Sequence, residues 1–87
     1  MSNATSISAQ IRQFITTNFY VAQQTTVQDE DSLLEKGIVD STGIMEVVGF
    51  LESTFGVAVA DAELVPENLD SIQRITAFVQ RKNADAG

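Results

Sequence analysis

The sequence contains no cysteine, no histidine and no tryptophan, and it has a single proline and a single tyrosine in 87 residues. Without cysteine the chain can form neither a disulfide nor a thiolate nucleophile. Without histidine, no serine of this chain has an imidazole base, which excludes a Ser–His–Asp arrangement. Any zinc site would have carboxylate ligands alone, which disfavours such a site. These absences predict a protein with no catalytic residues and no metal site.

Long apolar runs are also missing. No stretch approaches the roughly 20 apolar residues that span a bilayer, and no basic-then-apolar signal region opens the chain. The sequence therefore predicts no membrane insertion, and a cytoplasmic location is the default. A chain of this length is expected to form one domain over residues 1–87, ordered from about 6 to 82, with flexible termini.

Basic residues are few and acidic residues are concentrated. Five lysines and arginines oppose 12 aspartates and glutamates, so the net charge is −7. Eleven of the acids lie between residues 29 and 70, where Lys36 is the one basic residue. Such a charge distribution repels nucleic acid and anionic lipid and attracts basic protein surfaces. The alternative is that the acids only keep a small domain soluble.

Three segments, residues 6–20, 41–55 and 71–82, carry apolar residues at helical spacing. The stripes are Ile7, Ile11, Phe14 and Ile15; Ile44, Val48, Leu51 and Phe55; and Ile72, Ile75 and Val79, with Phe78 at the edge of the last. Thr5 or Ser6 can cap the first helix, and Pro66 can open a short helical turn. The predicted fold is all-α, with three main helices, one short helix and a long loop between the first and second.

The long loop covers residues 21–39, although β-type residues at 19–27 leave a strand as an alternative there. Four apolar residues are spaced to hold the loop on a core: Val27, Leu33, Leu34 and Ile38. Its acidic turn, residues 29–31, lacks the alternating ligands, central glycine and closing glutamate of a calcium loop. A solvated turn is the favoured interpretation, and no metal is predicted.

The stretch 37–46 reads as a turn that leads into a helix. Asp40 stands where an N-cap belongs, and Ser41 occupies the first helical position. The free N–H groups and the dipole at a helix start favour an anion, so a phosphate ester on Ser41 would be well placed. Lys36 is a poor base for this serine, because the neighbouring carboxylates favour its charged form. Gly56 is expected to end this helix, and Asp70 to cap the last one.

Residues 33–41, Leu-Leu-Glu-Lys-Gly-Ile-Val-Asp-Ser, resemble the attachment motif of the acyl carrier and peptidyl carrier protein family. In that family a turn with glycine and two apolar residues precedes an Asp-Ser pair that opens the second helix. Glu52-x-x-Phe55-Gly56 and the run Pro-Glu-Asn-Leu-Asp-Ser-Ile at 66–72 match its downstream pattern. The resemblance covers about residues 6–82.

The resemblance implies a non-catalytic, monomeric four-helix carrier domain. Its phosphate acceptor would be Ser41, esterified by 4′-phosphopantetheine that a phosphopantetheinyl transferase takes from coenzyme A; Asp40 belongs to the same motif. The arm's thiol would hold an acyl or aminoacyl group as a thioester. The implied partners are this transferase, an acyl- or aminoacyl-activating ligase and a downstream synthase or transferase of fatty-acid-like or specialised metabolism.

Carriers of this family use the second helix for docking, which implies a partner role for Thr42, Met45, Glu46 and Phe50. Met45 and Phe50 could instead border the core. Thr42 stands where the family prefers an apolar residue, and Gly43 where many fatty-acid carriers have an acid, so partner choice is expected to depend on these two positions. Whether Gly43 and Gly49 serve close packing or partner approach is open.

Two other functions are compatible with the residues: an unmodified acidic helical interaction module with a carrier-like fold, and a hydrolase that uses carboxylates. The absence of histidine and of a deep cleft disfavours the hydrolase. The pocket between the helices could shelter a short acyl chain or be filled by the protein's own side chains. The residues expected to line it are Ile44, Val47, Val48, Leu51 and Ile75.

Overall fold

The computed structural model describes residues 3–86, and all regular structure within them is helical. The α-helices are α1 (Asn3–Asn18), α2 (Tyr20–Gln24), α3 (Ser41–Phe55), α4 (Pro66–Leu69) and α5 (Ile72–Ala86), and a 3₁₀ turn, η1 (Asp61–Glu63), precedes α4. This confirms the all-α fold class. The strand alternative at residues 19–27 is wrong, because α2 occupies most of that segment and no strand occurs in the described range. The loop before α3 is accordingly shorter than predicted.

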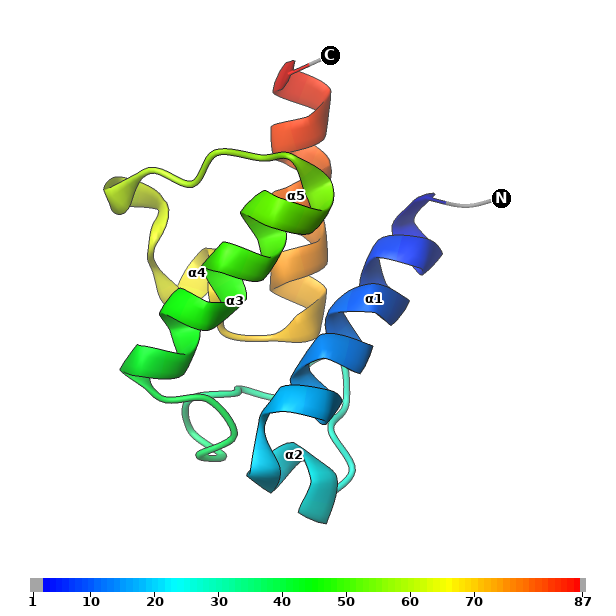
Figure 1. The fold of residues 1–87 in the computed structure, drawn as a ribbon, viewed down its shortest axis with the longest axis vertical. Coiled ribbons are helices and arrows are strands. Elements are labelled where there is room, and N and C mark those ends of the chain that lie inside the picture. Colours follow the sequence, from blue (N-terminus) through cyan, green and yellow to red (C-terminus); the bar gives the residue numbers. More distant parts are fainter. Residues whose placement is uncertain (1–2, 87) are drawn as a thin grey trace.

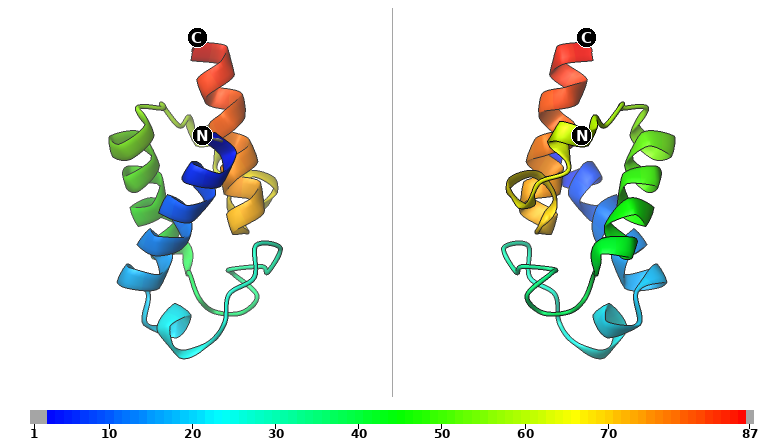
Figure 2. Two further views of the ribbon diagram at one scale, coloured as in Figure 1. Left: turned by 90° about the vertical axis from the view of Figure 1, so that its right-hand side faces the viewer. Right: turned by 90° about the vertical axis from the view of Figure 1, so that its left-hand side faces the viewer.

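The three long helices form the body of the molecule (Figure 1). α1 runs away from the end where both described termini lie, while α3 and α5 run back toward it. The connection after α3 returns along the bundle to α4, so α5 starts near the end where α3 starts (Figures 1 and 2). The loop between α2 and α3 closes that same end of the bundle. The start of α3 therefore lies close to the α4–α5 junction and to the loop.

The predicted apolar stripes meet in one core. Fully buried side chains come from every long helix and from the loop: Ile11, Ile15, Leu33, Val39, Val47, Leu51, Ile72, Ile75, Phe78 and Val79. Phe78 is thus a core residue and not an edge residue as predicted. Each large side chain that is fully buried contributes about 1.5–3 kcal/mol. Val27, Leu33 and Ile38 hold the loop on this core as expected, whereas Leu34 is 41% exposed, so its prediction as a core residue is wrong.

Local signals set the bounds of α3. The Asp40 side chain accepts a hydrogen bond from the Gly43 backbone N–H (2.7 Å), which confirms the predicted N-cap. Gly56 ends the helix in the left-handed conformation, with φ 68°, and donates to the Glu52 carbonyl (3.1 Å). Pro66 opens the short helix α4 as predicted. Sequence and structure therefore agree on where α3 begins and ends.

The outer helix ends differ from the sequence prediction. α1 begins at Asn3, so Thr5 and Ser6 lie within the helix and are not caps. α5 continues to Ala86, which places Arg81 and Lys82 before the last turn and not in it. Arg81 donates to the Asn68 side chain (2.8 Å) and Lys82 pairs with Glu63 (2.9 Å). These cations hold η1 and α4 against α5. The termini predicted to be flexible lie before about residue 6 and after residue 82. Residues 3–5 and 83–86 are instead helical, and residues 1–2 and 87 lie outside the described residues.

Candidate functional site

Ser41 stands alone and accessible at the start of α3. It is the first residue of the helix, it is exposed, and its hydroxyl has no hydrogen-bond partner within residues 3–86. Asp40 satisfies the third amide of the helix, that of Gly43, and its carbonyl accepts from Ile44 (2.9 Å). The amides of Ser41 and Thr42 have no partner in the described structure, so the positive end of the helix dipole faces outward beside the hydroxyl.

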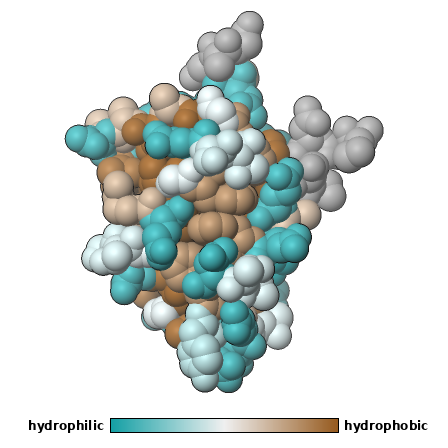
Figure 3. Space-filling model, in the orientation of Figure 1, coloured by the Kyte–Doolittle hydropathy of each residue, from teal (hydrophilic) through white to brown (hydrophobic). Residues whose placement is uncertain are grey.

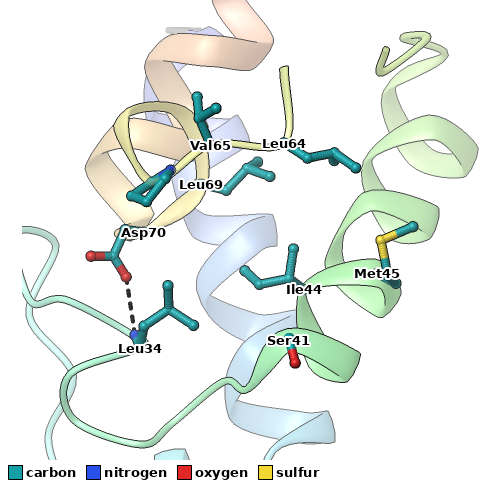
Figure 4. Close-up of a pocket in the computed structure, with 9 residues that line it drawn as sticks. Leu34, Ser41, Ile44, Met45, Leu64, Val65, Leu69 and Asp70 are labelled. Atoms are coloured by element: carbon teal, nitrogen blue, oxygen red, sulfur yellow. Dashed lines mark hydrogen bonds between the residues drawn. The ribbon is translucent and has the colours of Figure 1, made fainter. Parts of the chain in front are cut away.

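An apolar cavity of about 280 Å³ lies beside Ser41, between the start of α3, the loop and the segment around α4 (Figure 4). Its lining residues are Leu34, Ser41, Ile44, Met45, Leu64, Val65, Pro66, Leu69 and Asp70. In Figure 4 the Ser41 hydroxyl points away from the cavity, while the Leu34, Ile44 and Leu69 side chains point toward it. A group attached to Ser41 would therefore start outside the cavity, at its rim.

The cavity is not the one expected from the sequence. Of the residues predicted to line a sheltered interior, Ile44 alone borders this cavity. Val47, Val48, Leu51 and Ile75 are between 0% and 6% exposed and fill the core themselves. The cavity wall instead includes Leu34, Leu64 and Val65, which the sequence analysis did not assign to a site. Leu64 and Val65 belong to no helical stripe. This apolar pair before Pro66 is the sequence feature that could have indicated the cavity wall.

Asp70 is the one charged residue in the cavity lining, and it faces the loop. Its Oδ2 accepts from the Ser32 hydroxyl (2.6 Å) and its Oδ1 from the Leu34 amide (3.0 Å). Its carbonyl accepts from the Leu33 amide (2.7 Å). The predicted role of Asp70 as the cap of α5 is therefore wrong. Ser71 caps that helix, because its hydroxyl accepts from the Arg74 amide (3.0 Å).

The residues predicted to contact partners separate into two groups. Thr42, Met45 and Glu46 are exposed on α3 near Ser41, and Met45 is 54% exposed while also lining the cavity. Phe50 is half-buried toward α1, where it stacks on Phe14 with 4.2 Å between ring centroids. Figure 3 shows apolar surface around α3 and the connection after it, interrupted by hydrophilic side chains. Of the two predicted aromatic and sulfur side chains, Met45 is the accessible one and Phe50 borders the core.

The two glycines of α3 have different surroundings. Gly43 is buried, and a Cβ built on it would lie 2.7 Å from Phe19 Cε1 and 3.1 Å from Val39 Cγ1. Gly49 is exposed, and a Cβ there would have no neighbour within 4 Å. Gly43 therefore serves close packing and presents no exposed surface to a partner. Thr42 remains exposed and available to a partner.

Two acidic side chains have their pKa lowered by local contacts. The pKa of Asp31 is lowered chiefly by a hydrogen bond from the Gln28 amide, with help from Lys36. The pKa of Glu63 is lowered chiefly by the Ala60 amide and then by Lys82. Both carboxylates are thus structural. Across residues 3–86, no three acidic side chains converge as metal ligands would.

Further ties hold the loop to the bundle. The Arg12 guanidinium of α1 donates to the Val27 carbonyl and pairs with Asp29. The Asp29 carbonyl accepts from the Gln73 amide of α5 (2.9 Å). The acidic turn at 29–31 is therefore part of the framework. None of the helices between residues 3 and 86 is long and apolar enough to cross a membrane.

Comparison with known proteins adds an independent line of evidence. No protein-family model matches the chain. It is 34% identical over 53 residues to a D-alanyl carrier protein of Abiotrophia defectiva, a match that covers 61% of this chain and 67% of that protein. It is 33% identical over 70 residues to the probable acyl carrier protein PigG of Serratia sp. (strain ATCC 39006), covering 80% of each chain.

Proposed function

Because this chain belongs to the acyl carrier and peptidyl carrier protein family, we propose that it carries an acyl or aminoacyl group on a 4′-phosphopantetheine arm attached to Ser41. The observation that carries the proposal is the position of this serine. Its hydroxyl is exposed and has no hydrogen-bond partner in the described structure, at the first residue of a capped helix. When bound, the arm supplies a thiol that holds the cargo as a thioester.

The residues around Ser41 fit a phosphodiester. The amides of Ser41 and Thr42 and the dipole of a 15-residue helix favour a negative charge there. The Asp40 carboxylate is engaged by the Gly43 amide, which stabilises the helix start and partly offsets its charge. Because the Ser41 hydroxyl is exposed, an enzyme active site can reach it without any movement of the core.

The modification needs a separate enzyme. The Ser41 oxygen forms a bond to the phosphorus of the pantetheine phosphate, the pyrophosphate bond of coenzyme A breaks, and adenosine 3′,5′-bisphosphate leaves. The proton of the hydroxyl has to go to a base, and this chain contains no histidine. Asp40, the nearest carboxylate in sequence, already accepts a backbone hydrogen bond. A phosphopantetheinyl transferase would therefore supply the base, and the chain itself acts as a non-catalytic carrier.

Partner enzymes would dock on the start of α3. Thr42, Met45 and Glu46 are exposed around Ser41, and the segment that contains them is the acidic part of a chain with net charge −7. An apolar side chain flanked by acids suits a ligase or synthase surface that presents basic residues around an apolar patch. Phe50 would contribute through its accessible edge alone. The proposal places a monomeric carrier in the cytoplasm, where coenzyme A is available.

Mass spectrometry tests this function. The purified chain is incubated with coenzyme A and a broad-specificity phosphopantetheinyl transferase, and its intact mass is measured. The native chain should gain one phosphopantetheinyl group, Ser41→Ala should gain none, and Ser53→Ala, which removes another exposed serine of α3, should behave as native. Uptake by the Ser41→Ala protein would contradict the site. Failure of the native chain with several transferases would instead support the unmodified interaction module.

A further inference from the structure

The proposed function uses Ser41 and leaves Asp70 without a role. We propose that Asp70 is a positioning residue for the modification of Ser41. Its carboxylate latches the loop 32–39, called here the latch loop, and so holds the segment before Ser41 in the shape that a phosphopantetheinyl transferase binds. This inference rests on the proposed function, and its test separates the two.

Asp70 makes three hydrogen bonds to the latch loop. Two reach its carboxylate, from the Ser32 hydroxyl (2.6 Å) and the Leu34 amide (3.0 Å), and the third reaches its carbonyl from the Leu33 amide (2.7 Å). Figure 4 shows the Leu34 bond across the edge of the cavity. The side-chain partners lie 38 and 36 residues away in sequence. One residue at the α4–α5 junction thus holds three consecutive residues of the loop.

The constraint continues from Leu33 to Ser41. The Leu33 carbonyl accepts from the Ile38 amide (2.9 Å) and the Val39 amide (3.2 Å). The Leu33, Ile38 and Val39 side chains are at most 3% exposed, so this closed turn is also fixed to the core. Val39 is followed by Asp40, the cap of α3, and then by Ser41. A continuous set of contacts therefore joins Asp70 to the acceptor serine.

Burial alone does not hold the outer part of the latch loop. Residues 34–37 are exposed, and Gly37 adopts φ 69° there, a conformation that favours glycine. Ser32 also accepts from the Glu35 amide (3.1 Å), so its hydroxyl links the Asp70 carboxylate to this exposed turn. The exposed half of the loop is also held by its own backbone bonds, from the Lys36 amide to the Ser32 carbonyl and from the Gly37 amide to the Leu34 carbonyl (both 3.1 Å). The Asp70 carboxylate adds the tie between this turn and the α4–α5 junction.

Loss of the latch should change the apparent affinity of the transferase for its substrate and not the chemical step. If the transferase binds only the latched conformation, its apparent affinity falls in proportion to the fraction of molecules in that conformation. Asp70→Ala should raise the KM for this chain about 10-fold, with kcat within about 2-fold of native. A tenfold rise corresponds to about 1.4 kcal/mol, within the range for the net contribution of one intramolecular hydrogen bond.

Two control variants separate the latch from charge and from stability. Asp70→Asn removes the charge, but its Oδ1 can accept from Leu34 and its amide nitrogen can donate to Ser32, so KM should stay within about 2-fold of native. Ile75→Val shortens a fully buried α5 side chain and lowers stability without removing a hydrogen bond of the latch loop. Its KM should be unchanged. Amide exchange gives a second readout on unmodified protein: protection at Ile38 and Val39 should fall in Asp70→Ala and persist in Asp70→Asn.

Each outcome has a clear meaning. A native KM and native amide protection in Asp70→Ala would overturn the latch while leaving Ser41 as the acceptor. An equal KM rise in Asp70→Asn would assign the effect to charge, and an equal rise in Ile75→Val would assign it to stability; either overturns the inference. If Asp70→Ala does not fold, Ser32→Ala, which removes one latch bond, should still raise KM. If the native chain is never modified, the proposed function fails, and amide exchange alone decides the latch.

Discussion

The two glycines of α3 give a test in which the same substitution should have opposite effects. In an exposed helix interior, Gly→Ala stabilises by up to about 1 kcal/mol, because glycine is the more costly residue to order. Gly49 meets this condition, since an added Cβ would touch nothing within 4 Å. Gly49→Ala should therefore raise the free energy of unfolding by about 0.5–1 kcal/mol.

At Gly43 the stabilisation expected from Gly→Ala is outweighed by steric overlap of the added Cβ with its neighbours. The added Cβ would lie 2.7 Å from a ring atom of Phe19, closer than real Cβ contacts allow, and 3.1 Å from Val39. Phe19 cannot easily withdraw, because its ring packs edge-on against Phe14 with 6.1 Å between centroids, and Val39 is 1% exposed. Overpacking a close-packed site costs typically about 1–3 kcal/mol. Gly43→Ala should therefore lower stability by about 0–2 kcal/mol.

Urea and thermal unfolding followed by circular dichroism measure both variants. For a domain of this size, 1 kcal/mol shifts Tm by about 4–8 °C. Gly49→Ala should therefore raise Tm, Gly43→Ala should leave it unchanged or lower it, and the two variants should differ by several degrees. The native chain is the common reference, and both variants carry the same change in the same helix. A Gly43→Ala protein that is stabilised as much as Gly49→Ala would refute the inference that Gly43 is required for close packing.

Two further predictions concern stability. The pKa of Glu63 is lowered in the folded state by the Ala60 amide and Lys82. Its ionised carboxylate therefore stabilises the folded state at neutral pH, and this stabilisation is lost as the pH falls through and below the ordinary glutamate pKa of about 4.3. Glu63→Gln should thus lower the urea midpoint of unfolding at pH 7 and match the native midpoint at a pH where Glu63 is protonated. An equal drop in the midpoint at both pH values would contradict this. Phe50→Ala should cost about 2–3 kcal/mol because its ring stacks on α1, whereas exposed Met45→Ala should stay within about 0.5 kcal/mol; equal costs would refute the distinction.

The features that sequence predicted well depend on residues close together in the chain. The bounds of α3 follow from Asp40 before the helix and Gly56 after it, together with a stripe of apolar residues between them. The α4 turn follows from Pro66. The position of Ser41 at the helix start was likewise readable, because a cap residue fixes where the first helical residue stands.

The features that sequence missed are decided by distant partners. Asp70 and Ser71 are both suitable caps for α5, and the choice between them depends on Ser32 and Leu34, far back in the chain. Gly43 and Gly49 look alike in sequence and differ because Phe19 lies against one of them. The cavity wall was not readable for the same reason, since the loop, α3 and the α4 segment each contribute part of it.

The helix α2 was also not predicted from the sequence, for a different reason. Its five residues, Tyr20–Gln24, include β-type side chains and are too few to show a helical period. Its amide at Ala22 donates to the Phe19 carbonyl within the same turn (3.1 Å), and burial of the Ala22 side chain in the core supplies the tertiary contact that favours this turn. The predicted loop was therefore partly helix, although its role in carrying the chain to the start of α3 was correct.

The hydrogen bonds of Asp70 also have a consequence for the order of events during protein synthesis. The segment before Ser41 obtains its native bonds from a residue that is translated 36–38 positions after Leu34 and Ser32. A nascent chain that ends before Asp70 has the serine but lacks these hydrogen bonds to the loop before it. The segment before Ser41 therefore obtains its full set of hydrogen bonds only after Asp70 has been synthesised, so that a transferase selecting this shape would act on folded chains and pass over unfinished ones.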